Sequence, residues 1–234
     1  ELIGVTQRYH SNLILDQIDL SIQAKECCAL VGRNGVGKST LIQSMLGFLP
    51  VQAGHIRLNG IHVRNPAWKK HVAYLPEKFQ LYPHLTAYEN IHFFGSLYDK
   101  TPSEQKIETS LRQVDLWDQR DQFVRSFSKG MLQRLGLGIM LYYDAPILIL
   151  DEPTSGLDPV GRIDLLNLLK SLTDTPILFS SHHLDEIKQV CTHVALLHET
   201  KIKKYPIDQF EEKMMLGGML SWKKDLLCQT LKKK

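Results

Sequence analysis

Short apolar runs alternate with helical periodicities along the chain, and one longer helical stretch interrupts the alternation. Apolar or alternating runs predict β-strands at residues 2–9, 13–23, 27–31, 55–58, 61–63, 71–75, 147–150, 177–180 and 194–197. Apolar residues three and four apart predict helices at residues 41–46, 88–98, 103–114, 129–141, 165–172 and 184–190. The pair Asn59-Gly60 predicts a tight hairpin, since both turn residues need a positive φ.

This order of elements predicts an α/β fold with an antiparallel β section near the N-terminus and an inserted helical part. We expect one domain over residues 1–234, which suits a chain of this length. Residues 1–85 and 143–206 are expected to form its α/β core. Residues 86–142 are expected to form a helical subdomain, and residues 207–234 a C-terminal helical tail.

The tail is predicted to be helical from residue 207 and broken at Gly217-Gly218. Beyond the break, an apolar stripe runs beside lysines and consists of Met219, Leu220, Trp222, Leu226, Leu227 and Leu231. A basic amphipathic helix of this kind can lie on a membrane surface. The alternative is a terminal helix that docks on its own domain and leaves its lysines in water.

Composition narrows the classes of protein only slightly. A hydrophobic content of 43% supports a real core, while a net charge of +3 argues neither for nor against nucleic acid. No apolar run approaches the roughly 20 residues of a membrane span, and no leader-like segment indicates secretion. The four cysteines (Cys27, Cys28, Cys191 and Cys228) lack metal-ligand spacing, which favours buried free thiols in a reducing cytosol over a metal role.

The strongest local signal is a glycine-rich loop between a predicted strand and a predicted helix. It reads Gly32-Arg33-Asn34-Gly35-Val36-Gly37-Lys38-Ser39-Thr40 and fits G-x-x-x-x-G-K-[ST]. Glycines let successive backbone N–H groups point at an anion, and the following helix adds its positive N-terminal end. Lys38 can reach the outer phosphates and the Ser39 hydroxyl can bind Mg²⁺, so the loop predicts a nucleoside triphosphate site.

Two further stretches carry candidate chemistry. Asp151 and Glu152 follow an apolar strand, at the strand end where α/β folds place ligands. An aspartate there can hold Mg²⁺, and the next carboxylate can polarise a water molecule for attack on a γ-phosphate. Ser128 is placed to cap a helix, and Gly130 leaves a backbone N–H open to close approach.

Taken together, these residues make the chain similar to an ATP-binding-cassette (ABC) ATPase over nearly its whole length. The motifs follow the family's order, with an adenine-stacking aromatic at Tyr9, the Walker A loop at 32–40, the Q-loop at 75–77, the signature at 128–133, Walker B at 148–152, the D-loop at 155–158 and a switch histidine at His182. The resemblance implies a P-loop NTPase (RecA-like) core with an antiparallel β subdomain and an inserted α-helical subdomain. It also implies ATP and Mg²⁺ as ligands.

The resemblance assigns roles residue by residue. Glu152 would be the general base, His182 would contact the γ-phosphate and Lys38 would stabilise phosphate charge. Ser39, Glu77 and Asp151 would hold the metal. The nucleotide would contact Tyr9, Arg33, Asn34, Gly35, Val36, Gly37, Lys38, Ser39 and Thr40, and across a head-to-tail dimer Ser128, Lys129, Gly130, Met131 and Asp158. For His182 the alternative is a surface histidine after a strand.

Two departures from the family pattern narrow the resemblance. Most members have glutamine at the position of Glu77. The carboxylate of Glu77 adds negative charge beside the phosphates. The signature reads Phe-Ser-Lys-Gly-Met at residues 127–131, so Lys129 adds a positive charge near the partner's site. These variants resemble bacterial exporter-type ATPases, and residues 74–94 resemble the copper-processing ATPase of nitrous oxide reductase maturation. Antibiotic and polysaccharide exporters share the same variants, so the alternative is the ATPase of another exporter, of an antibiotic, a polysaccharide or a lipid.

We therefore expect an ATP-hydrolysing homodimer that energises a separate integral membrane permease and does not bind nucleic acid. An additional substrate-delivery protein is a further candidate partner. It would be cytoplasmic and attached to the inner face of the cell membrane through the permease. One rival is an ABC protein that works on ribosomes or DNA. Another is a regulatory nucleotide-binding module with negligible hydrolysis, which Glu152 and His182 argue against.

The segment after Glu77 is expected to dock the membrane partner. Five apolar residues lie in seven positions without a steady period, which suits a loop: Phe79, Leu81, Tyr82, Pro83 and Leu85. Exposed aromatic clusters commonly mark binding surfaces. The alternative is that these side chains pin the helical insertion to the core.

Overall fold

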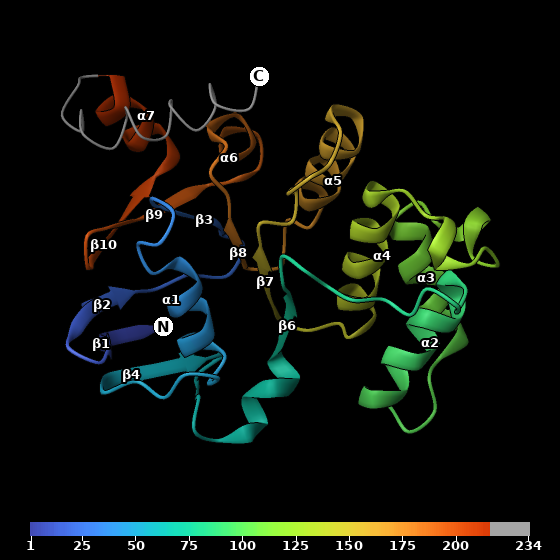
Figure 1. Cartoon of the computed structure of the whole chain (residues 1–234), viewed down its shortest axis with the longest axis horizontal. Helices are drawn as coiled ribbons and strands as arrows, with labels where there is room; N and C mark the ends of the chain where they lie inside the picture. Colours follow the sequence, from blue (N-terminus) through green and yellow to red (C-terminus); the bar gives the residue numbers. More distant parts are fainter. Residues whose placement is uncertain (216–234) are drawn as a thin grey trace.

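A six-stranded sheet forms the centre of the computed structural model, which describes residues 1–215 (Figure 1). Its order is β10 (Lys201–Pro206), β9 (His193–His198), β3 (Cys27–Val31), β8 (Ile177–Ser180), β7 (Ile147–Asp151) and β6 (Val72–Leu75). The strands from β9 to β6 are parallel, and β10 pairs antiparallel with β9. Strands β3 and β8 are buried along their entire length, as expected of parallel strands covered on both faces.

A second, antiparallel sheet of four strands is built from the N-terminal part of the chain. Its order is β2 (Asn12–Leu20), β1 (Leu2–Tyr9), β4 (Ala53–Leu58) and β5 (Ile61–His62). The predicted hairpin between β4 and β5 is confirmed, because Leu58 pairs with Ile61 while Asn59 and Gly60 have φ of 49° and 75°. Left-handed backbone at both central positions is what a two-residue hairpin requires.

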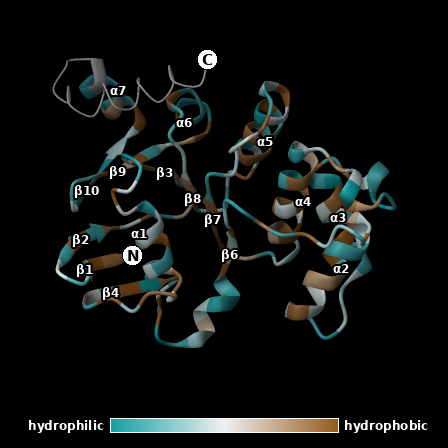
Figure 2. Cartoon of the chain, viewed as in Figure 1, coloured by the Kyte–Doolittle hydropathy of each residue, from teal (hydrophilic) through white to brown (hydrophobic). Residues whose placement is uncertain are grey.

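Helix α1 (Lys38–Met45) joins the two sheets through one apolar cluster. Leu41 and Ile42 are fully buried in it, together with Val5 of β1, Leu30 of β3 and Ile56 of β4. Figure 2 shows the corresponding apolar colouring along the inner strands. This packing fixes the start of α1 at the end of β3, where the glycine-rich loop lies.

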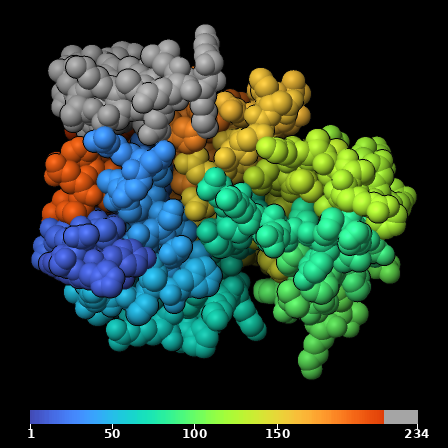
Figure 3. Space-filling view, viewed as in Figure 1, coloured from blue at the N-terminus to red at the C-terminus, as the bar shows by residue number. Residues whose placement is uncertain are grey.

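The helical insertion forms a separate lobe beside the sheets (green in Figure 3). It consists of α2 (Ala87–Tyr98), α3 (Glu104–Gln113) and α4 (Lys129–Tyr142), with short 3₁₀ helices at Trp117–Gln119 and Val124–Ser126. Each α-helix starts at a capping side chain, as the residue preferences at helix N-termini predict. Thr86 and Glu89 form a capping box on α2, while Ser103 and Ser128 cap α3 and α4.

The remaining helices differ in part from the sequence prediction. Helix α5 (Pro159–Ser171) begins well before the predicted residue 165, because Asp158 caps it and Pro159 occupies its first position. Helix α6 (Leu184–Val190) matches its prediction, and a 3₁₀ helix at Pro66–His71 was not predicted. Strand β10 was not predicted either, and it occupies an edge of the sheet.

The C-terminal tail is described only at its start. Helix α7 (Ile207–Met215) follows β10, and Phe210 is buried against the core. The Gly217-Gly218 break and the apolar stripe beyond it lie outside the described residues. No helix within residues 1–215 is both long enough and apolar enough to cross a lipid bilayer.

Candidate functional site

The glycine-rich loop is held in its shape by close approaches that no larger residue allows. A Cβ atom on Gly32 would lie 2.5 Å from the Leu197 carbonyl oxygen of β9. Gly37 has φ of 113°, and a Cβ there would lie 2.8 Å from a methyl group of Ile14. Gly35 has φ of 78°. Positive φ is readily available only to glycine, so the sequence dictates a backbone whose N–H groups can surround a phosphate.

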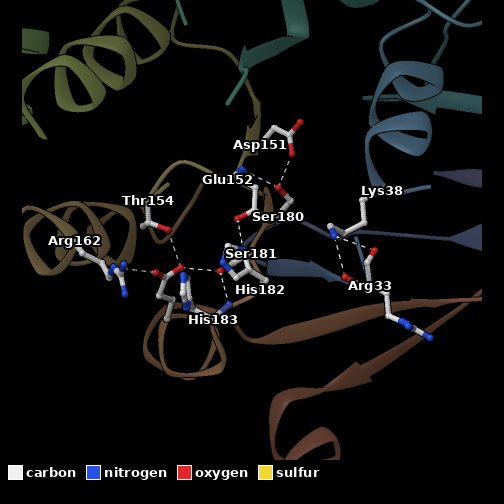
Figure 4. Close-up of polar contacts among 12 residues, drawn as sticks. Arg33, Lys38, Asp151, Glu152, Thr154, Arg162, Ser180, Ser181, His182 and His183 are labelled. Carbon is white, nitrogen blue, oxygen red and sulfur yellow. Dashed lines mark hydrogen bonds and ion pairs between the residues drawn. The ribbon is translucent and has the colours of Figure 1, made fainter. Parts of the chain in front are cut away.

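Lys38 begins α1 and lies under this loop. Its Nζ donates hydrogen bonds to the carbonyl oxygens of Gly32 at 2.9 Å and Arg33 at 3.4 Å. Burial lowers the pKa of Lys38, and the carboxylates of Glu152 and Asp151 oppose this lowering. The ammonium group is therefore buried and within electrostatic range of both carboxylates (Figure 4).

Asp151 ends β7 and Glu152 follows it directly, and Ser180 of the neighbouring strand β8 links the two residues. The Ser180 hydroxyl donates to Asp151 Oδ1 at 2.6 Å and accepts from the Glu152 backbone N–H at 2.7 Å (Figure 4). Glu152 has φ of 49°, a left-handed conformation that is uncommon for glutamate. Such conformations cluster at functional sites, where surrounding contacts hold them in place.

His182 lies directly beside Glu152. Its Nδ1 is 2.9 Å from Glu152 Oε2, and the two side chains are 21% and 15% exposed. Burial raises the pKa of Glu152, but the hydrogen bond from His182 and the nearby charges of His182, Lys38 and His183 outweigh it, so the pKa is lowered overall. The predicted base and the predicted switch histidine therefore meet, which argues against the surface-histidine alternative.

The glycine-rich loop can surround a phosphate, and an ionised carboxylate lies in the same site. Comparison with known proteins agrees with this arrangement. Residues 15–155 match the family model described as "ABC transporter". The chain belongs to the ABC transporter family. Its expected fold class, a P-loop NTPase core with antiparallel β and helical subdomains, is thereby confirmed, and the chain is an ATPase.

Relatives in the ABC transporter family are ATP-binding proteins. The linearmycin resistance ATP-binding protein LnrL of Bacillus subtilis is 32% identical over 84% of the chain and 65% of LnrL. The bacitracin transport ATP-binding protein BcrA of Bacillus licheniformis is 32% identical over 89% of the chain and 70% of BcrA. The chain thus spans about two thirds of the length of these relatives.

A solved structure entitled "Structure of ATP binding subunit of ABC transporter" is similar over most of both chains. Its TM-score is 0.80 at 29% sequence identity, and the match covers 92% of this chain and 93% of that chain. The likeness therefore extends beyond the segment matched by the family model.

The ABC signature residues lie on a different element from the phosphate loop. Ser128 caps α4, its hydroxyl accepting from the Met131 backbone N–H at 3.2 Å. Figure 1 places the start of α4 beyond α5 and β7, on the far side from α1. A Cβ on Gly130 would lie 3.8 Å from the Cα of Gly161, in ordinary van der Waals contact with α5. Within one chain the two motifs do not meet.

The other ABC motif residues lie nearer the surface. Tyr9 ends β1 and is 43% exposed, and Glu77 is exposed just after β6. Asp158 accepts a hydrogen bond from the Gly161 backbone N–H at 3.3 Å as the cap of α5. The Arg33 side chain points away from the carboxylates in Figure 4.

No cluster of three or more His, Cys, Asp or Glu side chains among residues 1–215 could hold a metal alone.

Sequence reasoning missed Ser180. A serine at the end of a strand carries no motif of its own, and its importance follows from register, because Ser180 is the parallel partner of Asp151. Ser180 is completely buried, where a hydroxyl needs hydrogen-bond partners. A serine at the end of one core strand, followed by His182, is the only signal that the sequence offers.

Proposed function

We propose that two copies of this chain bind ATP head to tail and that each hydrolyses it with Glu152 as the general base, energising a separate membrane permease. The observation that carries the proposal is the Glu152–His182 hydrogen bond of 2.9 Å beside the buried ammonium of Lys38. A base must be ionised and within reach of the reacting water. The lowered pKa of Glu152 keeps its carboxylate ionised at neutral pH.

The residues of the loop suit a Mg²⁺-bound nucleotide. The Ser39 hydroxyl and the Asp151 carboxylate, with Glu77 as a third candidate, offer the oxygen ligands that Mg²⁺ prefers. When bound, Mg²⁺ would neutralise charge on the phosphate oxygens. Lys38 would hold the outer phosphates, and the rest of the loop would contribute Arg33, Asn34, Gly35, Val36, Gly37 and Thr40. Tyr9 would stack on the adenine.

Each ATP site would combine the glycine-rich loop of one copy with the signature residues of the other. Such composite sites would explain why the signature lies away from the glycine-rich loop within one chain. Ser128, Lys129, Gly130 and Met131 would reach the phosphates of the partner copy, where the N-terminal end of α4 favours an anion. Asp158 would connect the two sites through the segment that precedes α5. Within a site, Glu152 would take the proton from the attacking water, while His182 holds that carboxylate in place.

The permease would dock at the cleft between the sheet and the helical lobe. A cavity of about 350 Å³ lies there, visible as a notch between the segment before β6 and α2 (Figure 3). Its lining includes Phe79, Phe94, Leu97 and Tyr98, with Lys69 and Lys70 at the rim. Leu97 and Tyr98 are 69% and 42% exposed, and exposed apolar patches of this kind mark binding sites.

The residues of the apolar segment after Glu77 differ in their contacts. Some suit attachment of the helical lobe to the core, and others suit docking of the membrane partner. Phe79 is half-buried, with its ring centroid 5.2 Å from that of Phe94, and it lies against Gly136 of α4. Tyr82 is 46% exposed and packs edge-on against Phe93 at 4.6 Å. Phe79 thus helps to attach the helical lobe, and Tyr82 with Leu97 offers the better docking surface.

The most specific part of the proposal is the substrate that the transporter would carry. A copper-processing exporter for nitrous oxide reductase maturation rests only on the resemblance of residues 74–94. The similarity to LnrL and BcrA, whose names refer to linearmycin resistance and bacitracin transport, supports an antibiotic-handling exporter instead. In either case the chain would act at the cytoplasmic face of the membrane, held there by its permease.

Copurification with the permease tests the transport role. The probe is a candidate permease chosen by inspecting the genes next to this one for a membrane protein, expressed with the chain and solubilised in detergent. The double variant Tyr82→Asp with Leu97→Asp should keep ATP binding and melting temperature but lose copurification. Ile3→Asp, which alters an equally exposed apolar residue of β1 (45%), is the control and should copurify normally. Undiminished copurification of the double variant would contradict docking at the surface that Tyr82 and Leu97 form.

A further inference from the structure

Glu186 is a charged residue in the interior that no motif explains. It lies in the first turn of α6, and its side chain is only 2% exposed. Glutamate is almost never fully buried unless it is paired, because removing a carboxylate from water is unfavourable. Three side chains from three other segments pair with it, and two of those segments carry the Glu152–His182 pair.

Two hydroxyl groups donate to the same oxygen of Glu186. Thr154 Oγ1 lies 2.8 Å and Ser181 Oγ 2.7 Å from Glu186 Oε2. Both donors are buried, with Thr154 1% and Ser181 0% exposed. Thr154 follows Glu152 by two residues and Ser181 directly precedes His182, so one carboxylate oxygen joins the two loops that carry the base and the histidine.

The other oxygen of Glu186 faces α5. Arg162 Nε lies 3.3 Å from Glu186 Oε1, an ion pair whose alignment is too poor for a hydrogen bond. Arg162 is one turn beyond Asp158, the cap of the same helix, and its backbone N–H donates to the Asp158 carbonyl at 3.0 Å. Figure 4 shows Arg162, Thr154 and Ser181 converging from different elements.

We propose that Glu186 is a positioning residue for ATP hydrolysis, which holds Glu152 and His182 at hydrogen-bonding distance by clamping the segments that carry them. Glu152 needs such support, because its left-handed backbone (φ 49°) is unfavourable for glutamate. Hydroxyl bonds to an ionised acceptor are short and strong, and in the dry interior they keep their geometry. Glu186 itself does not touch the reacting groups. The proposal rests on hydrolysis at Glu152 as proposed above.

A clamp and a general structural role predict different kinetics. A residue needed only for stability would change the melting temperature and would act alike in any background. A clamp acts through His182 and Glu152, so its loss should lower kcat while ATP affinity, which depends on the phosphate loop, stays unchanged. Displacement of a reacting group by about 1 Å can lower a rate by about 10²-fold.

The test compares kcat and the ATP dissociation constant among variants of the full chain. Glu186→Gln and Thr154→Val should lower kcat by about 10–10²-fold without weakening ATP binding, while Thr154→Ser should restore kcat by restoring the hydroxyl. In a His182→Ala background, Glu186→Gln should have a much smaller effect on kcat, because the pair that it positions is already broken. Glu211→Gln is the matched control and should leave kcat unchanged. It breaks an ion pair between Glu211 of α7 and Lys188, which lies on α6 as Glu186 does.

Two results would overturn the proposal. One is an equal loss of kcat from Glu186→Gln with and without His182, and the other is a parallel loss of ATP binding. If Glu186→Gln does not fold, Thr154→Val decides the question by the same comparison. Glu152→Gln is measured in the same assay, and full activity of that variant would refute the proposed base itself rather than the clamp.

Discussion

His182 Nδ1 lies 2.9 Å from Glu152 Oε2, and this contact helps to lower the pKa of the Glu152 carboxyl group. Burial is the largest influence on the pKa of Glu152 and raises it, yet the hydrogen bond and the charges of His182, Lys38 and His183 bring the pKa below its ordinary value of 4.5. His182 thus acts with Lys38 and His183 against the effect of burial on this carboxyl group.

We predict that removing His182 shifts the pH dependence of hydrolysis. In His182→Ala, burial is less opposed, so the pKa of Glu152 rises and its carboxylate becomes protonated at a higher pH. The acid limb of kcat against pH should therefore move to higher pH. His198→Ala removes an exposed histidine at the end of β9 and should leave the limb where it is. An acid limb at the same pH in His182→Ala and the unaltered protein would show that the contact does not set the pKa of Glu152.

The second prediction concerns composite sites. Lys38→Ala disables the phosphate loop, and Ser128→Arg disables the signature at the start of α4. Each homodimer should be nearly inactive, whereas a mixture should recover part of the activity, because a heterodimer has one doubly damaged site and one intact site. Steady-state hydrolysis is measured as the two proteins are mixed at constant total concentration.

Concentration provides the control for this mixing experiment. Activity of the unaltered protein should rise more steeply than in proportion to protein at low concentration, since monomers lack half of each site. Activity strictly proportional to protein, together with no gain on mixing, would mean that each chain works alone.

The third prediction is that Glu77 changes metal dependence rather than catalysis. Glu77 is exposed just after β6, and a carboxylate is a harder anionic ligand than an amide. Glu77→Gln should therefore retain its maximal rate but need more Mg²⁺ to reach half of it. A Mg²⁺ titration of hydrolysis checks this, with Glu89→Gln in the capping box of α2 as a control remote from the phosphate loop. Superimposable titrations of Glu77→Gln and the unaltered protein would place Glu77 away from the metal.

The sequence predicts those parts of the fold that local patterns determine. Continuous apolar runs identify the buried parallel strands, and Asn59-Gly60 identifies its hairpin, because only a few residues tolerate the required φ. The glycine-rich loop is equally local, since Gly32 and Gly37 are fixed by close approach and by φ. Its position after β3 therefore follows from the order of residues alone.

What the sequence could not predict depends on register and on burial of polar groups. Strand β10 was missed because three of its six residues are lysines and Lys203 and Lys204 are adjacent, which interrupts the apolar alternation; lysines are common on edge strands exposed to water. Ser180 matters only because parallel pairing places it beside Asp151. Glu186 could not be singled out from the sequence, since a charge on a short helix gives no sign of the Thr154 and Ser181 hydroxyls that the fold brings to it.

The most direct test of the central claim is ATP turnover by Glu152→Gln. This variant keeps the shape of the side chain and the loop around it but removes the base, so the purified protein should bind ATP with unchanged affinity. Its kcat should fall by about 10²–10⁴-fold, the usual loss when general base catalysis is removed. Lys38→Ala, measured beside it, should weaken ATP binding itself. Near-normal kcat in Glu152→Gln would contradict the account, because hydrolysis would then need a base other than the carboxylate that His182 holds in place.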